Sequence, residues 1–191
     1  MQAAHDLVHC RVENHIATLT LNRPDQRNAI DPAMTRAMRS AMDRFEADEA
    51  VWVGILTGAG DRAFCAGMDL KAFAAGLGDQ VMDEKGGFAA VTRYPRTKPL
   101  IAAVNGAALA GGFEIVLACD LVVAAETAMF GVPEVKRGIF AGAGGAFRLP
   151  RTIPRARAME MLLTGDPIDA STALALGLVR SEEHTSELQS H

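Results

Sequence analysis

Three short apolar runs, spaced along the chain, constrain its fold more than any other feature. They are Val51–Thr57, Leu100–Val104 and Leu121–Ala124. Runs this short and this continuously apolar are typical of strands that are buried on both faces of a sheet. The segment Gly111–Ala118, between the second and third runs, has the character of a buried helix. Strands that alternate with helices predict an α/β fold.

Other segments extend this pattern on both sides. His15–Leu21 alternates apolar and polar residues, as a strand with one buried face would. Asp31 followed by Pro32 predicts the start of a helix, and Arg155–Leu163 predicts an amphipathic helix. The segment Ala74–Thr92 is rich in glycine and lacks a period, so we expect a long or mobile loop that carries binding residues. The apolar residues at helical spacing after Pro32 are Met34, Met38, Ala41, Met42 and Phe45.

Length and composition describe an ordinary globular domain. The chain has 191 residues, of which 49% are apolar and 22% charged, with a formal net charge of −4 and no block of like charges. These values argue against a nucleic-acid partner or a membrane anchor. The first twelve residues are too polar for a signal peptide, and no apolar run is long enough to span a membrane. An odd and small number of cysteines, three, fits reduced thiols better than a disulfide framework. We therefore expect a cytoplasmic protein.

Two glycine-containing turns are candidates for anion binding. One lies in AFCAGMDLKAF (63–73), where a turn with Gly67 precedes a helix expected to start near Met68. The other lies in IAAVNGAALAGGFEIVLACD (101–120), where Gly111 and Gly112 open a helix. Amides at a helix start have no partner within the helix, so they can bind an anion or a developing oxyanion. Plain strand-to-helix loops are the alternative.

Two acidic residues stand out in their surroundings. Glu114 lies in the first turn of an otherwise apolar helix, where a carboxylate is either a favourable first-turn residue or a buried functional group. Glu134 follows Pro133 in MFGVPEVKRGI (129–139), which predicts a fixed loop that directs one carboxylate. A solvent-exposed loop glutamate is the alternative. The next segment, FAGAGGAFRLPR (140–151), predicts close backbone packing near a site.

Two other chemistries are weakly supported. GAGDRA (58–63) imitates a dinucleotide fingerprint, with Asp79 at the expected distance, but a second turn interrupts the helix that the fingerprint requires. Cys65 lacks a histidine in the central sequence that could activate it, because all five histidines lie near the ends. No cluster has the spacing of metal ligands.

Five motifs in series resemble the crotonase superfamily, also called the enoyl-CoA hydratase/isomerase family. They are LNRPDQRNAI, AFCAGMDL, VNGAALAGGFEIVLACD, FGVPEVKRGI and GAGGAFRLPR. The resemblance covers about Val12 to Val179. It implies a spiral of repeated ββα units with a C-terminal helical region that is largely missing here, and a homotrimer or hexamer for the full-length protein.

The resemblance also implies a site. The amides of Met68 and Gly111 would form an oxyanion hole, and Glu114 and Glu134 would be the acid–base pair. Ala66, Met68, Asp69, Leu70, Lys71 and Gly111 would contact the acyl-CoA, with no further cofactor and no metal. The implied reaction is hydration of a 2-enoyl-CoA. The alternatives are dehydration of another 3-hydroxyacyl-CoA such as a carnitine-type thioester, double-bond isomerisation, a non-catalytic CoA-thioester binder and an NAD-dependent oxidoreductase.

The last twelve residues depart from the pattern. RSEEHTSELQSH (180–191) contains one apolar residue and follows a predicted strand or turn at Leu176–Val179. It resembles the in-frame translation of a widely used DNA sequencing adapter. We therefore expect a core domain at 1–179, truncated at its C-terminus and expected to have little activity alone, and a non-native polar tail at 180–191.

Overall fold

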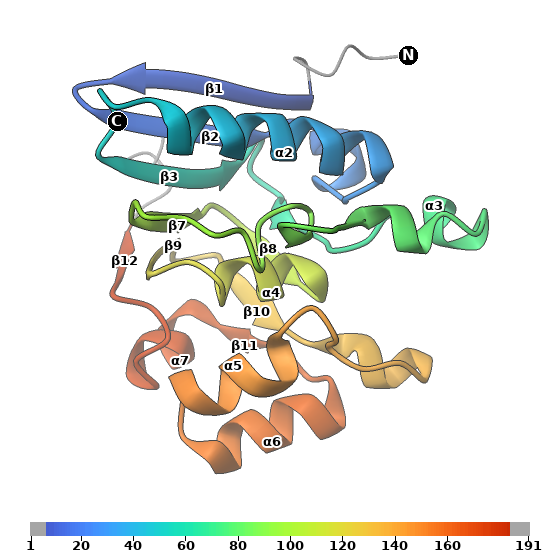
Figure 1. The fold of residues 1–191 in the computed structure, drawn as a ribbon. Helices are drawn as coiled ribbons and strands as arrows, with labels where there is room; N and C mark the ends of the chain where they lie inside the picture. Colours follow the sequence, from blue (N-terminus) through green and yellow to red (C-terminus); the bar gives the residue numbers. More distant parts are fainter. Residues whose placement is uncertain (1–6, 184–191) are drawn as a thin grey trace.

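The fold is a stack of ββα units, as the computed structural model shows for residues 7–183 (Figure 1). An antiparallel hairpin and one long helix come first, and three units follow. In each unit a strand, a short second strand and a helical segment succeed one another, which confirms the expected spiral. The first part comprises β1 (Val8–Glu13), β2 (Ile16–Leu21), η1 (Pro24–Gln26) and α2 (Pro32–Ala47). The units comprise β3 (Val53–Gly58), β4 (Ala63–Cys65) and α3 (Leu70–Ala74); β7 (Leu100–Val104), β8 (Ala107–Leu109) and α4 (Gly111–Val116); and β9 (Leu121–Ala125), β10 (Met129–Gly131) and η3 (Pro133–Arg137).

The two strands of each unit belong to different sheets. The first strands of the three units, β3, β7 and β9, lie in a six-stranded sheet that also contains β1, β2 and β12 (Ser181–Glu183). The strand order is β1-β2-β3-β7-β9-β12, and the sheet is parallel from β2 onward. The second strands, β4, β8 and β10, are parallel to one another and lie in a four-stranded sheet with β11 (Ile168–Asp169). The strand order is β11-β10-β8-β4, and β11 is antiparallel to β10. Since the carboxyl ends of parallel strands meet at one edge, the turns that follow β4, β8 and β10 are brought together.

The long helix α2 forms as its sequence predicts. The Asp31 side chain accepts a hydrogen bond from the Met34 amide at 2.7 Å, and Pro32 is the first residue of the helix. The five apolar residues at helical spacing are all buried. Figure 1 shows α2 lying along β1 and β2.

The strand predictions are confirmed in position and partly wrong in burial. Along β3, Gly54, Leu56 and Gly58 are buried, whereas Val53, Ile55 and Thr57 are only half-buried. One face of the six-stranded sheet is therefore fully covered and the other is not. A continuous apolar run marks a strand, but it does not reveal how completely its second face is covered.

The segment expected to be a long or mobile loop is folded and packed. It contains η2 (Gly78–Val81) and a small hairpin of β5 (Met82–Asp83) and β6 (Gly87–Phe88). All residues from 86 to 92 are buried. Its elements are too short to produce a period, so no sequence pattern indicated them. The helix expected near Met68 starts two residues later, because Asp69 is its N-cap.

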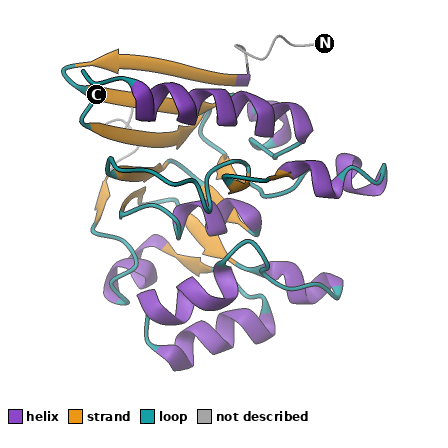
Figure 2. Cartoon of the chain, viewed as in Figure 1, coloured by secondary structure: helices purple, strands orange, loops and turns teal. Residues whose placement is uncertain are grey.

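Helices dominate the last part of the described chain (Figure 2). Leu176–Val179, predicted to be a strand or a turn, is a turn, and β12 starts just after it and pairs in parallel with β9. The first residues of the expected non-native tail thus join the six-stranded sheet, while residues 184–191 lie outside the described residues. The elements are α5 (Gly145–Thr152), α6 (Arg155–Thr164), β11 (Ile168–Asp169), α7 (Ala170–Ala175) and β12 (Ser181–Glu183).

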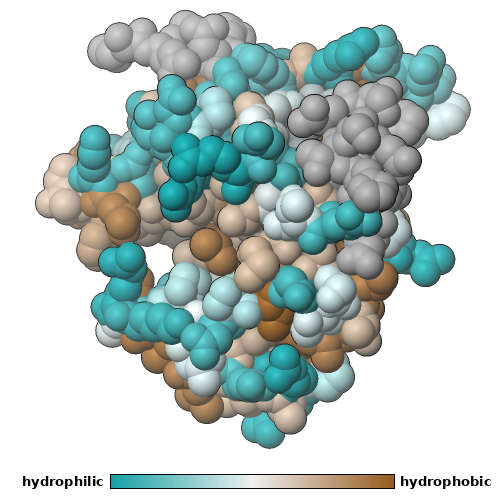
Figure 3. All heavy atoms as spheres, turned by 180° about the vertical axis from the view of Figure 1, so that it is seen from behind, coloured by the Kyte–Doolittle hydropathy of each residue, from teal (hydrophilic) through white to brown (hydrophobic). Residues whose placement is uncertain are grey.

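Apolar side chains remain exposed in this last part. Leu163 is 67% exposed and Phe140 is 76% exposed, and Ile139 and Phe147 are each about half exposed. Figure 3 shows apolar surface spread over the lower part of the molecule. Within residues 7–183, no helix is long and apolar enough to cross a membrane.

Candidate active site

Two tight turns meet at the carboxyl ends of β4 and β8. Gly67 has a φ of +89°, and a Cβ added there would lie 3.0 Å from the Cβ of Ala110 and 3.1 Å from the amide nitrogen of Gly111. A side chain at Gly67 would be strained by this φ and crowded by the neighbouring turn. The two glycine turns singled out in the sequence are therefore in direct contact.

Each turn presents an amide that has no partner within residues 7–183. The Met68 amide lies between two hydrogen bonds to Ile30: the Ile30 amide donates to the Gly67 carbonyl, and the Asp69 amide donates to the Ile30 carbonyl, each at 2.8 Å. Gly111 is the first residue of α4, so its amide lacks an acceptor within the helix. Neither the Met68 nor the Gly111 amide donates to another group in the described part of the chain.

Backbone geometry at α4 reinforces this arrangement. Ala110, just before the helix, has a φ of +51°, a region that residues with a Cβ rarely adopt. Its carbonyl accepts the amides of Phe113 and Glu114 at 2.9 and 3.1 Å, so those donors are satisfied. Strain of this kind persists only where the surrounding structure holds it, and it gathers at functional sites.

Glu114 is buried at the base of these turns. It is 3% exposed, and its Oε1 accepts a hydrogen bond from the Gly145 amide at 2.8 Å. Burial raises the pKa of this carboxyl from 4.5 to about 7; the Gly145 amide opposes the rise, and the negative charge of Glu134 adds to it. Of the two readings that the sequence left open, the buried one is correct.

Glu134 faces the same region from η3, where Pro133 is the first residue. It is 7% exposed, so the alternative of a solvent-exposed loop residue is wrong. Its Oε2 has no hydrogen-bond partner within residues 7–183, and burial raises its pKa. Its negative charge is one of the causes that raise the pKa of Glu114, so the two carboxyls lie close enough to interact.

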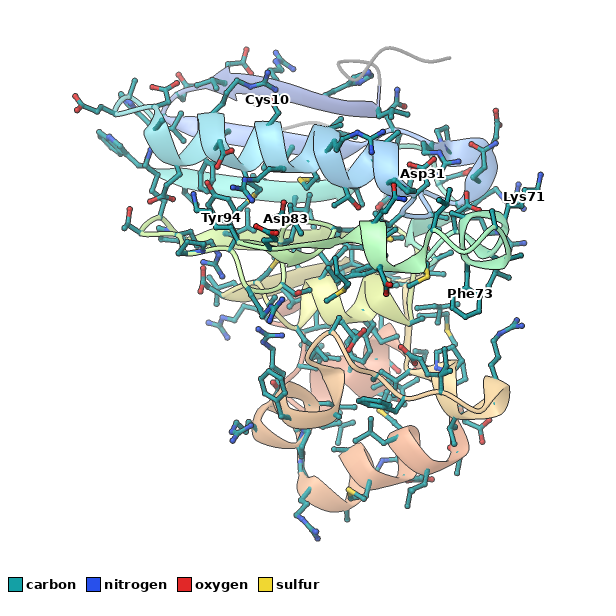
Figure 4. All side chains as sticks on the ribbon, turned by 45° about the vertical axis from the view of Figure 1, so that its right-hand side comes forward. Cys10, Asp31, Lys71, Phe73, Asp83 and Tyr94 are labelled. Atoms are coloured by element: carbon teal, nitrogen blue, oxygen red, sulfur yellow. The ribbon has the colours of Figure 1, made fainter. Side chains whose placement is uncertain are left out.

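An open pocket of about 650 Å³ lies beside the Met68 turn. Five of the six residues expected to contact acyl-CoA line it: Ala66, Met68, Asp69, Leu70 and Lys71. The sixth, Gly111, does not, because it faces the region between the two turns instead. Figure 4 shows Asp31, another lining residue, and Lys71 on the same side of the molecule, with Phe73 on the opposite side of α3 from Lys71.

Arg23 is a lining residue that the sequence did not single out. It forms ion pairs with Asp31 at 3.3 Å and Asp69 at 3.1 Å, and it donates to the Ala29 carbonyl at 2.7 Å. Asp69 also caps α3 by accepting from the amides of Lys71 and Ala72, and these donors keep its pKa low even though burial opposes them. Arg23 thus fixes the start of α3 beside the pocket.

Two buried asparagines, which the sequence also did not single out, hold the loop between β3 and β4. Asn28 donates to the carbonyls of Ala59 and Ala63, and Asn105 donates to those of Gly58 and Gly60. Asparagine in a polar, turn-rich run is common, so only the apolar context of Asn105 could have marked it as buried.

The alternative chemistries find no support in the described residues. Strand β4, not a helix, follows GAGDRA, so the dinucleotide fingerprint lacks its helix. Cys65 is fully buried, and burial raises the pKa of its thiol to about 12, which leaves it unreactive. Within residues 7–183, no group of three histidines, cysteines or acids could hold a metal ion.

A spiral of ββα units whose strands alternate between two sheets is the architecture of the crotonase fold. Comparison with known proteins agrees: residues 11–191 match the family model described as enoyl-CoA hydratase/isomerase. The chain belongs to the enoyl-CoA hydratase/isomerase family. Relatives in this family carry hydratase and dehydratase names, so the chain is an enzyme of the lyase type.

Individual relatives are similar over nearly the whole chain. An (E)-benzylidenesuccinyl-CoA hydratase from Thauera aromatica is 43% identical over 93% of this chain and 70% of its own length. A carnitinyl-CoA dehydratase from Proteus mirabilis is 40% identical over 95% of this chain and 69% of its own length. The crystal structure of an enoyl-CoA hydratase from Mycobacterium marinum superposes with a TM-score of 0.90 at 51% identity, covering 96% of this chain and 71% of that one. The chain thus spans about 70% of the length of these relatives.

Proposed function

We propose that the protein catalyses reversible hydration of a 2-enoyl-CoA thioester to a 3-hydroxyacyl-CoA. One observation carries this proposal: two glutamates are buried together beside two unpaired amides. Buried carboxyls without ion-pair partners are costly to a fold, so their presence favours a catalytic role.

The two amides would stabilise the charge that develops on the substrate. With the thioester oxygen between the Met68 and Gly111 amides, the enolate that forms during addition of water gains two donors. A donor of this kind contributes about 3 kcal/mol to the transition state in well-studied cases. The backbone supplies both donors, so the chemistry depends on the shape of the two turns and not on side chains.

The two carboxyls would move the protons. One carboxylate takes a proton from water as the water oxygen bonds to Cβ, and the other, protonated carboxyl delivers a proton to Cα. Glu114, with a pKa of about 7, is poised to exist in both forms near neutral pH. Because the pair titrates as one unit, the two roles belong to Glu114 and Glu134 jointly.

The pocket beside the Met68 turn would hold the CoA part of the substrate. Ala66, Asp69 and Leu70 line it, and the Lys71 ammonium offers a positive charge to phosphates. We further propose a cytoplasmic location, no cofactor beyond the CoA of the substrate, and a homotrimer or hexamer for the full-length protein. The exposed side chains of Phe140 and Leu163 are apolar surface that association would cover.

Dehydration of a carnitine-type 3-hydroxyacyl-CoA is a second candidate. The carnitinyl-CoA dehydratases of Proteus mirabilis and of Mycobacterium avium are 40% and 43% identical to this chain. Dehydration of a 3-hydroxyacyl-CoA is the reverse of hydration of a 2-enoyl-CoA, so one pair of acids would serve either direction. Isomerisation of the double bond and non-catalytic thioester binding are further alternatives.

A comparison of glutamate variants tests the proposal. Crotonyl-CoA hydration is measured in the full-length protein for wild type, Glu114→Gln, Glu134→Gln and the double variant, with the exposed Glu49→Gln as matched control. We expect each single variant to lower kcat by several powers of ten, and the double variant to lose far less than their product, because groups that act together are non-additive. Near-normal hydration in either single variant would contradict the assignment. Dehydration of carnitinyl-CoA without hydration of crotonyl-CoA would favour the second candidate, and thioester binding without either reaction would favour the non-catalytic one.

A further inference from the structure

A strained turn follows the small β5–β6 hairpin. Gly87, Ala89 and Ala90 have φ values of +70°, +53° and +57°. Left-handed backbone is costly for alanine, because its Cβ approaches the following carbonyl oxygen. Two such alanines in succession need strong support from their surroundings, and strain that is supported in this way is a pointer to function. Phe88 lies in the middle of this turn.

Hydrogen bonds hold the turn in place. The Phe88 amide donates to Oγ1 of Thr92 at 3.0 Å, and the Ala89 amide donates to the Val81 carbonyl at 3.0 Å. Arg148, from α5, donates through Nη2 to the Thr92 carbonyl at 2.5 Å. The turn is therefore braced from both the hairpin side and the α5 side.

The ends of the segment are tied to α2. Asp83 forms an ion pair with Arg39, and the Tyr94 hydroxyl donates to Asp43. Figure 4 shows Asp83 and Tyr94 close together below α2. With both ends and the middle fixed, the turn has little freedom to move aside for a ligand.

The Phe88 ring lies against the first residue of α4. A Cβ added to Gly111 would lie 2.5 Å from both Cε1 and Cζ of Phe88. In a helix the Cα–Cβ direction tilts toward the N-terminus, which is also where the unpaired amides point. The ring thus lies next to Gly111, whose amide has no partner within residues 7–183. It is 3% exposed and takes no part in the acid–base chemistry.

We infer that Phe88 determines acyl-group size: its ring is a fixed wall that admits short, unbranched acyl groups and excludes branched or aryl groups. This inference rests on the proposed function, which places the thioester carbonyl at the Gly111 amide. In that arrangement the acyl group lies next to Gly111, and therefore within reach of the ring that packs on this residue. A rigid wall there discriminates by steric exclusion, and a hydrophobic pocket can distinguish a single methylene by about 10-fold to 200-fold.

Substrate ratios test the inference. Hydration of crotonyl-CoA, 3-methylcrotonyl-CoA and cinnamoyl-CoA is measured for wild type, Phe88→Ala, Phe88→Leu and the matched control Phe45→Leu. Phe45 is buried like Phe88 but packs on Gly54 of β3. In Phe88→Ala we expect kcat/KM for cinnamoyl-CoA to rise at least ~10-fold relative to crotonyl-CoA. Phe88→Leu should shift the ratio in the same direction by less, and it keeps the test valid if the alanine variant does not fold.

The control separates size selection from loss of stability. Phe45→Leu should leave the ratio within about 2-fold of wild type, since its effect would be that of an ordinary core substitution. An unchanged ratio in both Phe88 variants, or an equal shift in Phe45→Leu, overturns the inference.

A binding measurement keeps this test independent of the proposed function. These measurements use the full-length protein, because the 191-residue chain is expected to have little activity alone. If full-length wild type hydrates none of the thioesters, hydration as the function is wrong, and calorimetry then compares the Kd values of butyryl-CoA and 3-phenylpropionyl-CoA. A wall at Phe88 predicts that Phe88→Ala and Phe88→Leu shift the Kd ratio toward the aryl ligand, whatever the reaction. A Kd ratio that both variants leave unchanged overturns the inference in that case.

Discussion

Replacing Glu114 by glutamine should stabilise the fold at neutral and alkaline pH while it removes activity. Burial raises the pKa of Glu114 from 4.5 to about 7. Each tenfold change in a protonation equilibrium is worth about 1.4 kcal/mol, so ionising this buried carboxyl costs the folded state about 3 kcal/mol. Because the side chain is only 3% exposed, solvent screening hardly reduces this value. Glutamine keeps an acceptor for the Gly145 amide and carries no charge to bury.

The pH dependence has a definite sign. Below about pH 4.5 the carboxyl is protonated in both states, and its neutral form imposes no cost. Between the two pKa values the unfolded chain releases the proton while the folded chain keeps it, so wild type loses stability as pH rises. Above about pH 7 the loss is complete. The advantage of Glu114→Gln over wild type should therefore grow by about 2.5 kcal/mol between about pH 5 and about pH 8.

Urea unfolding at several pH values, followed by circular dichroism, measures this difference. The exposed Glu49→Gln is the matched control and should show no such growth. An advantage that stays constant with pH, or one that grows as pH falls, would refute a buried carboxyl that is costly to ionise.

Three further predictions concern activity and stability. The kcat/KM for hydration should change with an apparent pKa near 7, the value of Glu114, and a flat profile through neutral pH would contradict this role. Gly111→Val should abolish turnover, because the valine side chain would collide with Phe88. Met68→Leu should be mild, because only the amide of residue 68 is used. Equal loss of activity in both variants would count against the two-amide site. Asn105→Ala should lower the free energy of unfolding by about 3 kcal/mol, because it leaves the buried Gly58 amide and carbonyl and the partly buried Gly60 carbonyl without their partner. A urea midpoint like that of wild type would disprove this.

The sequence predicted most of the fold because its signals were local. The cap at Asp31, the apolar stripe of α2 and the runs that became β3, β7 and β9 each depend on a few neighbouring residues. The strand β1 (Val8–Glu13) was missed: its apolar residues Val8, Cys10 and Val12 are too few to stand out in a polar N-terminal segment, and only Val8 is buried. Its pairing with β2 supplies what its composition does not.

The site was predictable in part. The glycine turns and the acids at 114 and 134 stand out in the sequence, and the structure brings them together. The contacts that set their properties could not be predicted: the Gly145 amide reaches Glu114 across 31 positions, and Arg148 reaches Thr92 across 56. The stacking of the units brings such distant partners together, and no local sequence pattern indicates how the units stack.

The candidate site is built from three successive ββα units, so its geometry depends on the correct stacking of all three. The Met68 amide comes from the first unit, the Gly111 amide and Glu114 from the second, and Glu134 from the third. In arrays whose units contact only their neighbours, one end can loosen while the other stays folded. Here a loosened or slipped unit would separate the reacting groups by whole strand spacings, so partly unfolded molecules would be inactive even with most of their secondary structure intact. Loss of activity should then precede loss of circular dichroism as denaturant rises.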